Sequence, residues 1–194
     1  MNAEKVIPVN TEVHWNKDLE LVSKTDKAGT IRYANEAFVN VSGYEEYELV
    51  GQGHNIIRHP DMPKVIFKLL WSNLLKGKDF HAVVKNMAKN GRYYWVITRF
   101  EIFKNDKGEI TGYMGRRKSV QPEVAERVEE LYKKLVQIEE ASGIEAAEDY
   151  LTGYLEDQKK TYEEYLSDIL ESAKSMPEED KNTSKKSIFR RLFG

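Results

Sequence analysis

The chain has 194 residues, of which 40% are hydrophobic, and its formal net charge at pH 7 is −2. This length fits one domain with an appendage or two small domains, and no stretch approaches the roughly 20 apolar residues of a membrane-spanning helix. Cysteine is absent, which excludes a disulfide framework, a thiolate metal site and a cysteine nucleophile. Because the N-terminus lacks the apolar core of a signal peptide, we expect a cytoplasmic protein.

The two parts of the chain carry net charges of opposite sign, which nearly cancel in the total. Residues 1–120 contain 19 basic and 14 acidic residues, whereas residues 121–194 contain 11 basic and 18 acidic residues. Such a change of sign indicates a boundary between segments. The sequence therefore predicts four segments, namely an N-terminal cap over 1–18, a mixed domain over 19–120, a helical hairpin over 121–176, and a polar linker with a basic amphipathic tail over 177–194.

The mixed domain begins with a predicted hairpin. Strand candidates over 19–23 and 30–33 flank Asp26-Lys27-Ala28-Gly29, whose residue types favour a turn. Asn35 suits the N-cap of the helix that follows, and a second short helix is expected over 44–50. The chain therefore passes from two strands into helices within about thirty residues, which is typical of an α+β domain.

A longer helix is predicted over 63–76, because its apolar residues follow the spacing of a buried helical face. Three strand candidates come next, over 80–88, 93–103 and 110–117, and Asn90-Gly91 between the first two is a strong hairpin signal. The resulting order of elements predicts an α+β fold in which a five-stranded antiparallel sheet carries helices on one face.

The segment that follows the mixed domain, over 121–176, is predicted to be helical. Its first predicted helix has apolar residues at coiled-coil-like steps, namely Val124, Val128, Leu131, Leu135 and Ile138. Ser142-Gly143 separates it from a second helix over about 144–175, which contains Gly153. Two amphipathic helices joined by a short loop form an αα-hairpin, and we expect their apolar stripes to pack on each other or on the mixed domain.

The last ten residues combine apolar and basic side chains. Ile188, Phe189, Leu192 and Phe193 would share one helical face, flanked by the basic residues Lys185, Lys186, Arg190 and Arg191. A basic amphipathic end of this kind can lie on an anionic membrane surface or dock into a partner groove. A tail without structure is the alternative.

The segment N-I-I-R-H-P-D-M-P, from Asn55 to Pro63, is the most informative feature of the sequence. Its two prolines restrict the backbone, so Arg58, His59 and Asp61 are held on a stiff turn. The guanidinium of Arg58 suits phosphate oxygens, and Trp71 in the following helix suits a flat ring. The segment therefore favours an anionic ligand with a flat ring; an ordinary surface loop with Asp61 as a helix cap is the alternative.

Three motifs in this region carry a resemblance to PAS domains. The stretches T-D-K-A-G-T-I-R-Y-A-N-E-A-F (25–38) and V-S-G-Y-E-E-Y-E-L-V-G-Q (41–52) look like the opening of a PAS domain. The stretch H-N-I-I-R-H-P-D-M-P-K (54–64), with Trp71 downstream, resembles more specifically the FAD-binding PAS domain of the bacterial aerotaxis receptor Aer and the stand-alone energy-taxis PAS proteins such as CetB. The resemblance covers roughly residues 19–119.

The resemblance implies that the chain binds FAD without covalent attachment. Arg58 and His59 would meet the pyrophosphate, Asp61 would orient them or accept from a hydroxyl or ring N–H, and Trp71 would stack on the ring. Asn86 lies mid-strand, where asparagine is disfavoured, and its amide can donate or accept. Because flavin reduction turns the N5 acceptor of the ring into a donor, we expect Asn86 or a neighbour to convert redox state into a change of sheet geometry.

The same resemblance implies a sensor rather than an enzyme. The chain would report redox or respiratory state to a separate membrane chemoreceptor by protein contact, and the lack of a membrane span favours the stand-alone arrangement. Weak membrane-surface contact through Lys185, Lys186, Arg190 and Arg191 would bring it to the inner face of the membrane. Self-association as a PAS homodimer is a further expected contact. No nucleic acid partner is expected.

Two other readings of the PAS resemblance stay open. A haem-binding oxygen sensor needs an axial ligand, for which His54, His59 and His81 are candidates. A PAS module without a cofactor needs only a core filled by side chains. An enzyme is disfavoured, because the sequence offers neither a glycine-rich phosphate loop nor a metal-ligand cluster.

Overall fold

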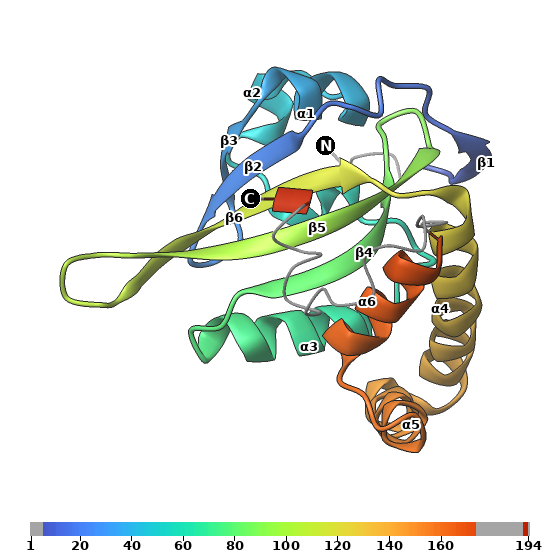
Figure 1. Cartoon of the computed structure of the whole chain (residues 1–194). Helices are drawn as coiled ribbons and strands as arrows, with labels where there is room; N and C mark the ends of the chain where they lie inside the picture. The colour runs from blue at the N-terminus through green and yellow to red at the C-terminus, as the bar shows by residue number, and fades with distance from the viewer. Residues whose placement is uncertain (1–5, 174–191, 194) are drawn as a thin grey trace, which may run out of the picture.

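The computed structural model describes residues 6–173 and 192–193. The polar linker and the basic residues Lys185, Lys186, Arg190 and Arg191 lie outside the described residues. The described chain forms a curled sheet with helices on both of its faces (Figure 1).

Six strands form the sheet in the described part of the chain. They are β1 (Val9–Glu12), β2 (Leu21–Asp26), β3 (Ile31–Ala34), β4 (Phe80–Met87), β5 (Arg92–Lys104) and β6 (Ile110–Ser119). The order runs β3-β2-β6-β5-β4 through antiparallel pairs, as the sequence predicts for five strands. The sixth strand, β1, is parallel to the start of β5 and was expected only as part of a cap. All four of its residues are exposed, so no alternation of burial marked it in the sequence.

The helices fall into two groups. The first group lies between β3 and β4 and comprises α1 (Glu36–Ser42), α2 (Glu46–Leu49), the 3₁₀ helix η1 (His54–Ile57) and α3 (Lys64–Leu75). The second group follows β6 and comprises α4 (Pro122–Ser142), α5 (Ile144–Asp157) and α6 (Tyr162–Ala173). In Figure 1 α1 and α2 lie at the top beside β2 and β3, α3 lies below β4, and α4 and α6 lie to the right.

Asn35 caps α1 as predicted. Its Oδ1 accepts from the backbone N–H of Phe38 at 2.9 Å and from that of Val22 at 3.0 Å. Its Nδ2 donates to the carbonyl of Glu20 at 2.9 Å. One side chain therefore satisfies the helix terminus and ties α1 to β2.

The predicted second helix of the hairpin, over 144–175, is wrong as a single helix. Gly153 lies within α5, and the break falls instead at Lys159, which has a positive φ of 54°. A capping box starts α6, because the N–H of Thr161 donates to Glu164 Oε2 at 2.9 Å and the N–H of Glu164 donates to Thr161 Oγ1 at 3.2 Å. The T-x-x-E spacing was a sequence signal for this boundary.

Helices α4 and α6 pack on the face of the sheet that points away from α1–α3, which we call the outer face. Tyr132 of α4 donates its hydroxyl to the carbonyl of Val83 at 2.8 Å, and Glu163 of α6 accepts from His81 Nδ1 at 2.8 Å. The apolar seam of α4, including Val128 and Leu135, belongs to the same cluster of buried residues as the sheet. The expected packing of these helices on the mixed domain is therefore confirmed.

Candidate functional site

A cavity of about 310 Å³ lies between the inner face of the sheet and the first group of helices. Strands β2, β4, β5 and β6 form one wall, and η1 and α3 form the other. Two arginines, Arg58 and Arg117, line the cavity, and none of the described lining residues is a carboxylate. The cavity therefore offers an anionic ligand positive charge without opposing negative charge.

The alternation of side chains along each strand determines which residues of the sheet line the cavity. Residues two apart on a strand share a face, so Val84 and Asn86 of β4 both line it, as do Gly115 and Arg117 of β6. Gly115 makes room for its neighbour, because a Cβ on Gly115 would lie 2.6 Å from Arg117 Nη2. Any other residue at 115 would displace the guanidinium.

Aromatic rings line both walls of the cavity. Trp71 of α3 meets Tyr113 of β6 edge to face, with ring centroids 5.3 Å apart and an interplanar angle of 80°. Gly29, which has a φ of +83°, approaches the same indole, since a Cβ there would lie 3.5 Å from Trp71 Cζ2. Phe67 and Phe100 complete the aromatic lining. Such walls suit a flat ring.

Arg58 lies exposed at the cavity wall, immediately after η1. Its guanidinium carbon is 3.9 Å from the ring centroid of Phe67, and it forms no ion pair with any described residue. Its backbone makes a β-bridge to Asn86. The predicted ligand residues Arg58, Trp71 and Asn86 thus come together around one cavity.

His59 and Asp61, the other two predicted ligand residues, do not line the cavity. His59 is buried, and its Nδ1 accepts from the backbone N–H of Asp61 at 3.1 Å; burial lowers the pKa of His59. Asp61 Oδ2 lies 2.7 Å from Lys85 Nζ, which also bonds Glu129 Oε1 of α4 at 2.9 Å. These two residues therefore connect the turn to α4.

Asp61 does not cap α3. The N–H groups of Lys64 and Val65 donate instead to the carboxylate of Glu139, at 3.0 and 2.7 Å. Glu139 lies near the end of α4, so a residue far along the sequence satisfies the first turn of the helix that carries Trp71.

Three further cavity residues, Ser23, His54 and Arg117, form a buried network, and the sequence had singled out only His54 among them, as a candidate haem ligand. Arg117 Nη1 donates to Ser23 Oγ at 3.0 Å, and Arg117 Nη2 lies 2.9 Å from His54 Nε2. Ser23 Oγ lies 2.8 Å from the same nitrogen. Because a guanidinium only donates, Nε2 is an acceptor and the imidazole is neutral. Burial, and then the charge of Arg117, lower the pKa of His54 to about 3.

Two polar atoms of the cavity wall lack a hydrogen-bond partner within the described residues. They are Asn86 Nδ2 and Thr98 Oγ1, and both are buried. Buried polar groups are normally paired, so these atoms are donors suited to a ligand.

Strand alternation from Gly115 and Tyr113 to Arg117 was the sequence signal that could have added Arg117 to the predicted set.

The three candidate haem ligands are not arranged for that role. His54 lines the cavity, but Arg117 and Ser23 engage its Nε2. His59 lies outside the lining, and His81 lies on the outer face against Glu163. Among the described residues, no group of three or more metal-ligating side chains comes together.

Residues 31–117 match the family model described as the PAS fold. They adopt the PAS fold. Over 118 residues, or 61% of this chain, the sequence is 46% identical to the aerotaxis receptor of Escherichia coli (strain K12), of which the match covers 23%. It is 27% identical over 99 residues, or 51% of this chain, to a nitrogen fixation regulatory protein of Klebsiella pneumoniae, of which the match covers 20%. The chain thus spans less than a quarter of each relative.

Solved structures of PAS-related domains share this fold. A light-oxygen-voltage domain studied with a flavin analogue has a TM-score of 0.53 and 20% identity, covering 57% of this chain and 84% of that one. The light-state structure of the blue-light photoreceptor Aureochrome1 LOV has a TM-score of 0.50 and 22% identity, covering 55% and 86%. Within the described residues, every helix of the chain is too short or too polar to cross a membrane.

Proposed function

We propose that this chain is a cytoplasmic PAS sensor that binds FAD and reports redox state to a separate membrane chemoreceptor by protein contact. One observation carries the proposal: a cavity with aromatic walls, two arginines and two unpartnered donors within a PAS domain. The 46% identity to an aerotaxis receptor supports the same assignment.

The lining residues fit a flavin ring better than they fit a haem. The cavity volume of about 310 Å³ is at the small end of ligand pockets, so it suits an enclosed ring whose phosphates lie outside. Trp71 and Tyr113 would both contact the ring, and Arg58 would bind the pyrophosphate through its planar fork. Asn86 Nδ2 and Thr98 Oγ1 would donate to polar atoms of the ring. When bound, FAD would supply reversible electron uptake.

His59 and Asp61 have a different role in this proposal. They hold the turn that presents Arg58, because His59 is packed beneath it and Asp61 is anchored by Lys85. Their replacement would reduce FAD affinity by displacing Arg58.

The route from the cavity to the outer face runs through β4. Asn86 lines the cavity, and Lys85 bonds Asp61 and Glu129. A displacement of Asn86 would move Lys85 with it, since the two share a peptide bond. The displacement of Lys85 would reach α4 at Glu129. The same helix is bonded to the start of α3 through Glu139. We therefore assign α4–α6 as the output element.

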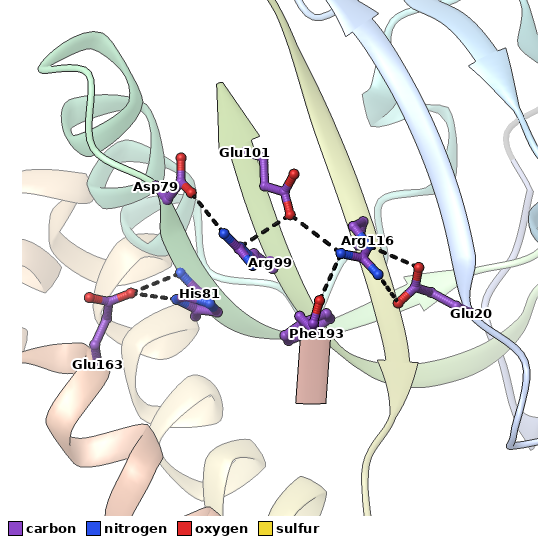
Figure 2. Close-up of polar contacts among 8 residues, drawn as sticks. All are labelled: Glu20, Asp79, His81, Arg99, Glu101, Arg116, Glu163 and Phe193. Carbon is purple, nitrogen blue, oxygen red and sulfur yellow. Dashed lines mark hydrogen bonds and ion pairs between the residues drawn. The ribbon is translucent and has the colours of Figure 1, made fainter. Parts of the chain in front are cut away.

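The outer face also offers a surface for the receptor or a second copy of the chain. Figure 2 shows Arg116 between Glu20 and Glu101, with Arg99 bonded to Glu101 and Asp79. Phe193 lies on this surface, where its carbonyl accepts from Arg116 Nη1 at 2.8 Å and its side chain is buried. A partner that uses this surface would compete with Phe193.

Purification of the full chain tests the cofactor. We expect a yellow protein with a two-band flavin spectrum, and heat release followed by chromatography should identify FAD rather than FMN. The Arg58→Ala variant should bind FAD at least tenfold more weakly, whereas Arg99→Ala on the outer face should bind as the wild type does. A colourless protein that stays colourless when titrated with FAD, or one with a Soret band, would overturn the proposal.

A further inference from the structure

Arg117 is a buried cation with only neutral hydrogen-bond partners. It is 3% exposed, and its guanidinium bonds Ser23 Oγ, the carbonyl of Gly115 at 2.9 Å and His54 Nε2. It forms no ion pair with any described residue. Taking a charge out of water is costly unless an opposite charge accompanies it, so an unpaired arginine here needs an explanation.

The neighbouring titratable groups do not provide the missing negative charge. The imidazole of His54 is neutral, as argued above, and burial raises the pKa of Tyr94 well above its usual range, which keeps that phenol neutral. The ring of Phe38, with its centroid 5.1 Å from the guanidinium carbon, offers only its π face. Burial lowers the pKa of Arg117 to about 10, so the residue remains protonated at neutral pH.

The two arginines of the cavity differ in depth. Arg58 is exposed and can meet phosphates in water, whereas Arg117 is buried on the sheet wall, opposite Thr98 in the β5–β6 register. A ligand group that contacts Arg117 must lie deep in the cavity. In the proposed complex the flavin ring would occupy that position, because the phosphates would lie outside the cavity. An oxidised flavin ring is neutral, but two electrons from an external reductant and one proton from water leave it with one negative charge.

We propose that Arg117 is the counter-ion of the reduced ring, so that this cavity binds the reduced, negatively charged flavin more tightly than the oxidised, neutral one. The inference rests on the proposed FAD site and adds the state that the site prefers. Preferential binding of the reduced form raises the midpoint potential of the bound flavin. Removing the charge should therefore lower that potential.

Arg117→Gln tests this, because glutamine keeps hydrogen-bonding capacity without charge, and Arg117→Lys keeps the charge. The readouts are the dissociation constant of oxidised FAD, from fluorescence quenching, and the midpoint potential, from titration with dithionite beside a reference dye. We expect Arg117→Gln to reduce the preference for the reduced form at least tenfold, which is about 30 mV for a two-electron couple. Arg117→Lys should shift it less, and Arg99→Gln on the outer face should not shift it.

A second variant decides the matter if Arg117→Gln does not fold. Thr98→Asp leaves Arg117 in place and sets a carboxylate beside it, since Thr98 and Arg117 are register partners on one face. Thr98→Asp should therefore lower the midpoint potential of the bound flavin, as Arg117→Gln does. An unchanged potential in a folded, FAD-loaded variant of either kind overturns the counter-ion role alone. A wild-type chain that binds no flavin overturns the proposed function and this inference together.

Discussion

Lys85 and Asn86 are consecutive residues of β4 that serve opposite faces of the sheet. Asn86 lines the cavity with an unpartnered amide nitrogen, and Lys85 bridges Asp61 and Glu129 at 2.7 and 2.9 Å. Because successive strand side chains point to opposite faces, this pair links the proposed ligand to α4 through one peptide unit. The proposed function therefore predicts that a change at the ligand site reaches α4 through this pair.

Lys85→Met should lower the free energy of unfolding. The substitution removes the cation that Asp61 and Glu129 share, and the side chain of Lys85 is only 6% exposed. Because both carboxylates retain access to water, we expect a loss of about 1–2 kcal/mol rather than the roughly 3–5 kcal/mol of a fully buried pair. Urea denaturation measures it. Lys133→Met is the matched control, since Lys133 also pairs with Glu129 but is 63% exposed; equal losses in both variants would contradict the role of Lys85.

Glu139→Ala should weaken the start of α3. The carboxylate accepts from two backbone N–H groups at a helix N-terminus, an interaction of about 1 kcal/mol. Since α3 carries Trp71, we expect weaker FAD binding together with the loss of stability. Chemical denaturation and FAD titration measure the two effects. Glu140→Ala, at an exposed neighbouring position, should leave both unchanged, and wild-type behaviour of Glu139→Ala would rule out this link.

Acidification should destabilise the protein through His54. Its folded pKa is lowered from 6.5 to about 3, so between these values the unfolded chain binds a proton that the folded chain does not. Stability therefore rises with pH across this window, and its loss on going from pH 7 to pH 5 is about 2 kcal/mol from this group. Urea denaturation at stepped pH measures the slope. His54→Gln should flatten it by about one proton, while His14→Gln, at an exposed position, should keep the wild-type slope.

Asn86→Ala should retain FAD but disconnect it from α4. The amide nitrogen has no partner within the described residues, so its removal costs the fold little, and we expect the affinity for FAD to change less than tenfold. Hydrogen exchange of α4 in the oxidised and reduced states measures the coupling, which should disappear in the variant. Asn105→Ala, in the exposed loop between β5 and β6, is the control. Persistence of the redox-dependent exchange in Asn86→Ala would refute the route through β4.

Local patterns were sufficient for most of the elements, β1 and the break between α5 and α6 excepted, and for much of the cavity. The cap at Asn35 and the hairpin at Asn90-Gly91 follow from residue types and alternation, because these interactions act over a few residues. The same patterns, with the family resemblance, singled out Arg58, Trp71 and Asn86. They could not assign the partners of His59 and Asp61, because the local sequence of a charged turn is the same whether the charged residue faces a ligand or a lysine distant in the chain.

The sequence by itself thus determined a PAS-like sheet, its helices and a stiff basic turn beside an aromatic residue. Only the tertiary structure decided that α4 and α6 cover the outer face, that Glu139 caps α3, and that Arg117 is buried without a counter-ion among the described residues. Each of these depends on contacts between residues that are distant in the chain. Hydrophobic periodicity reports which face of an element is buried but not which distant element buries it.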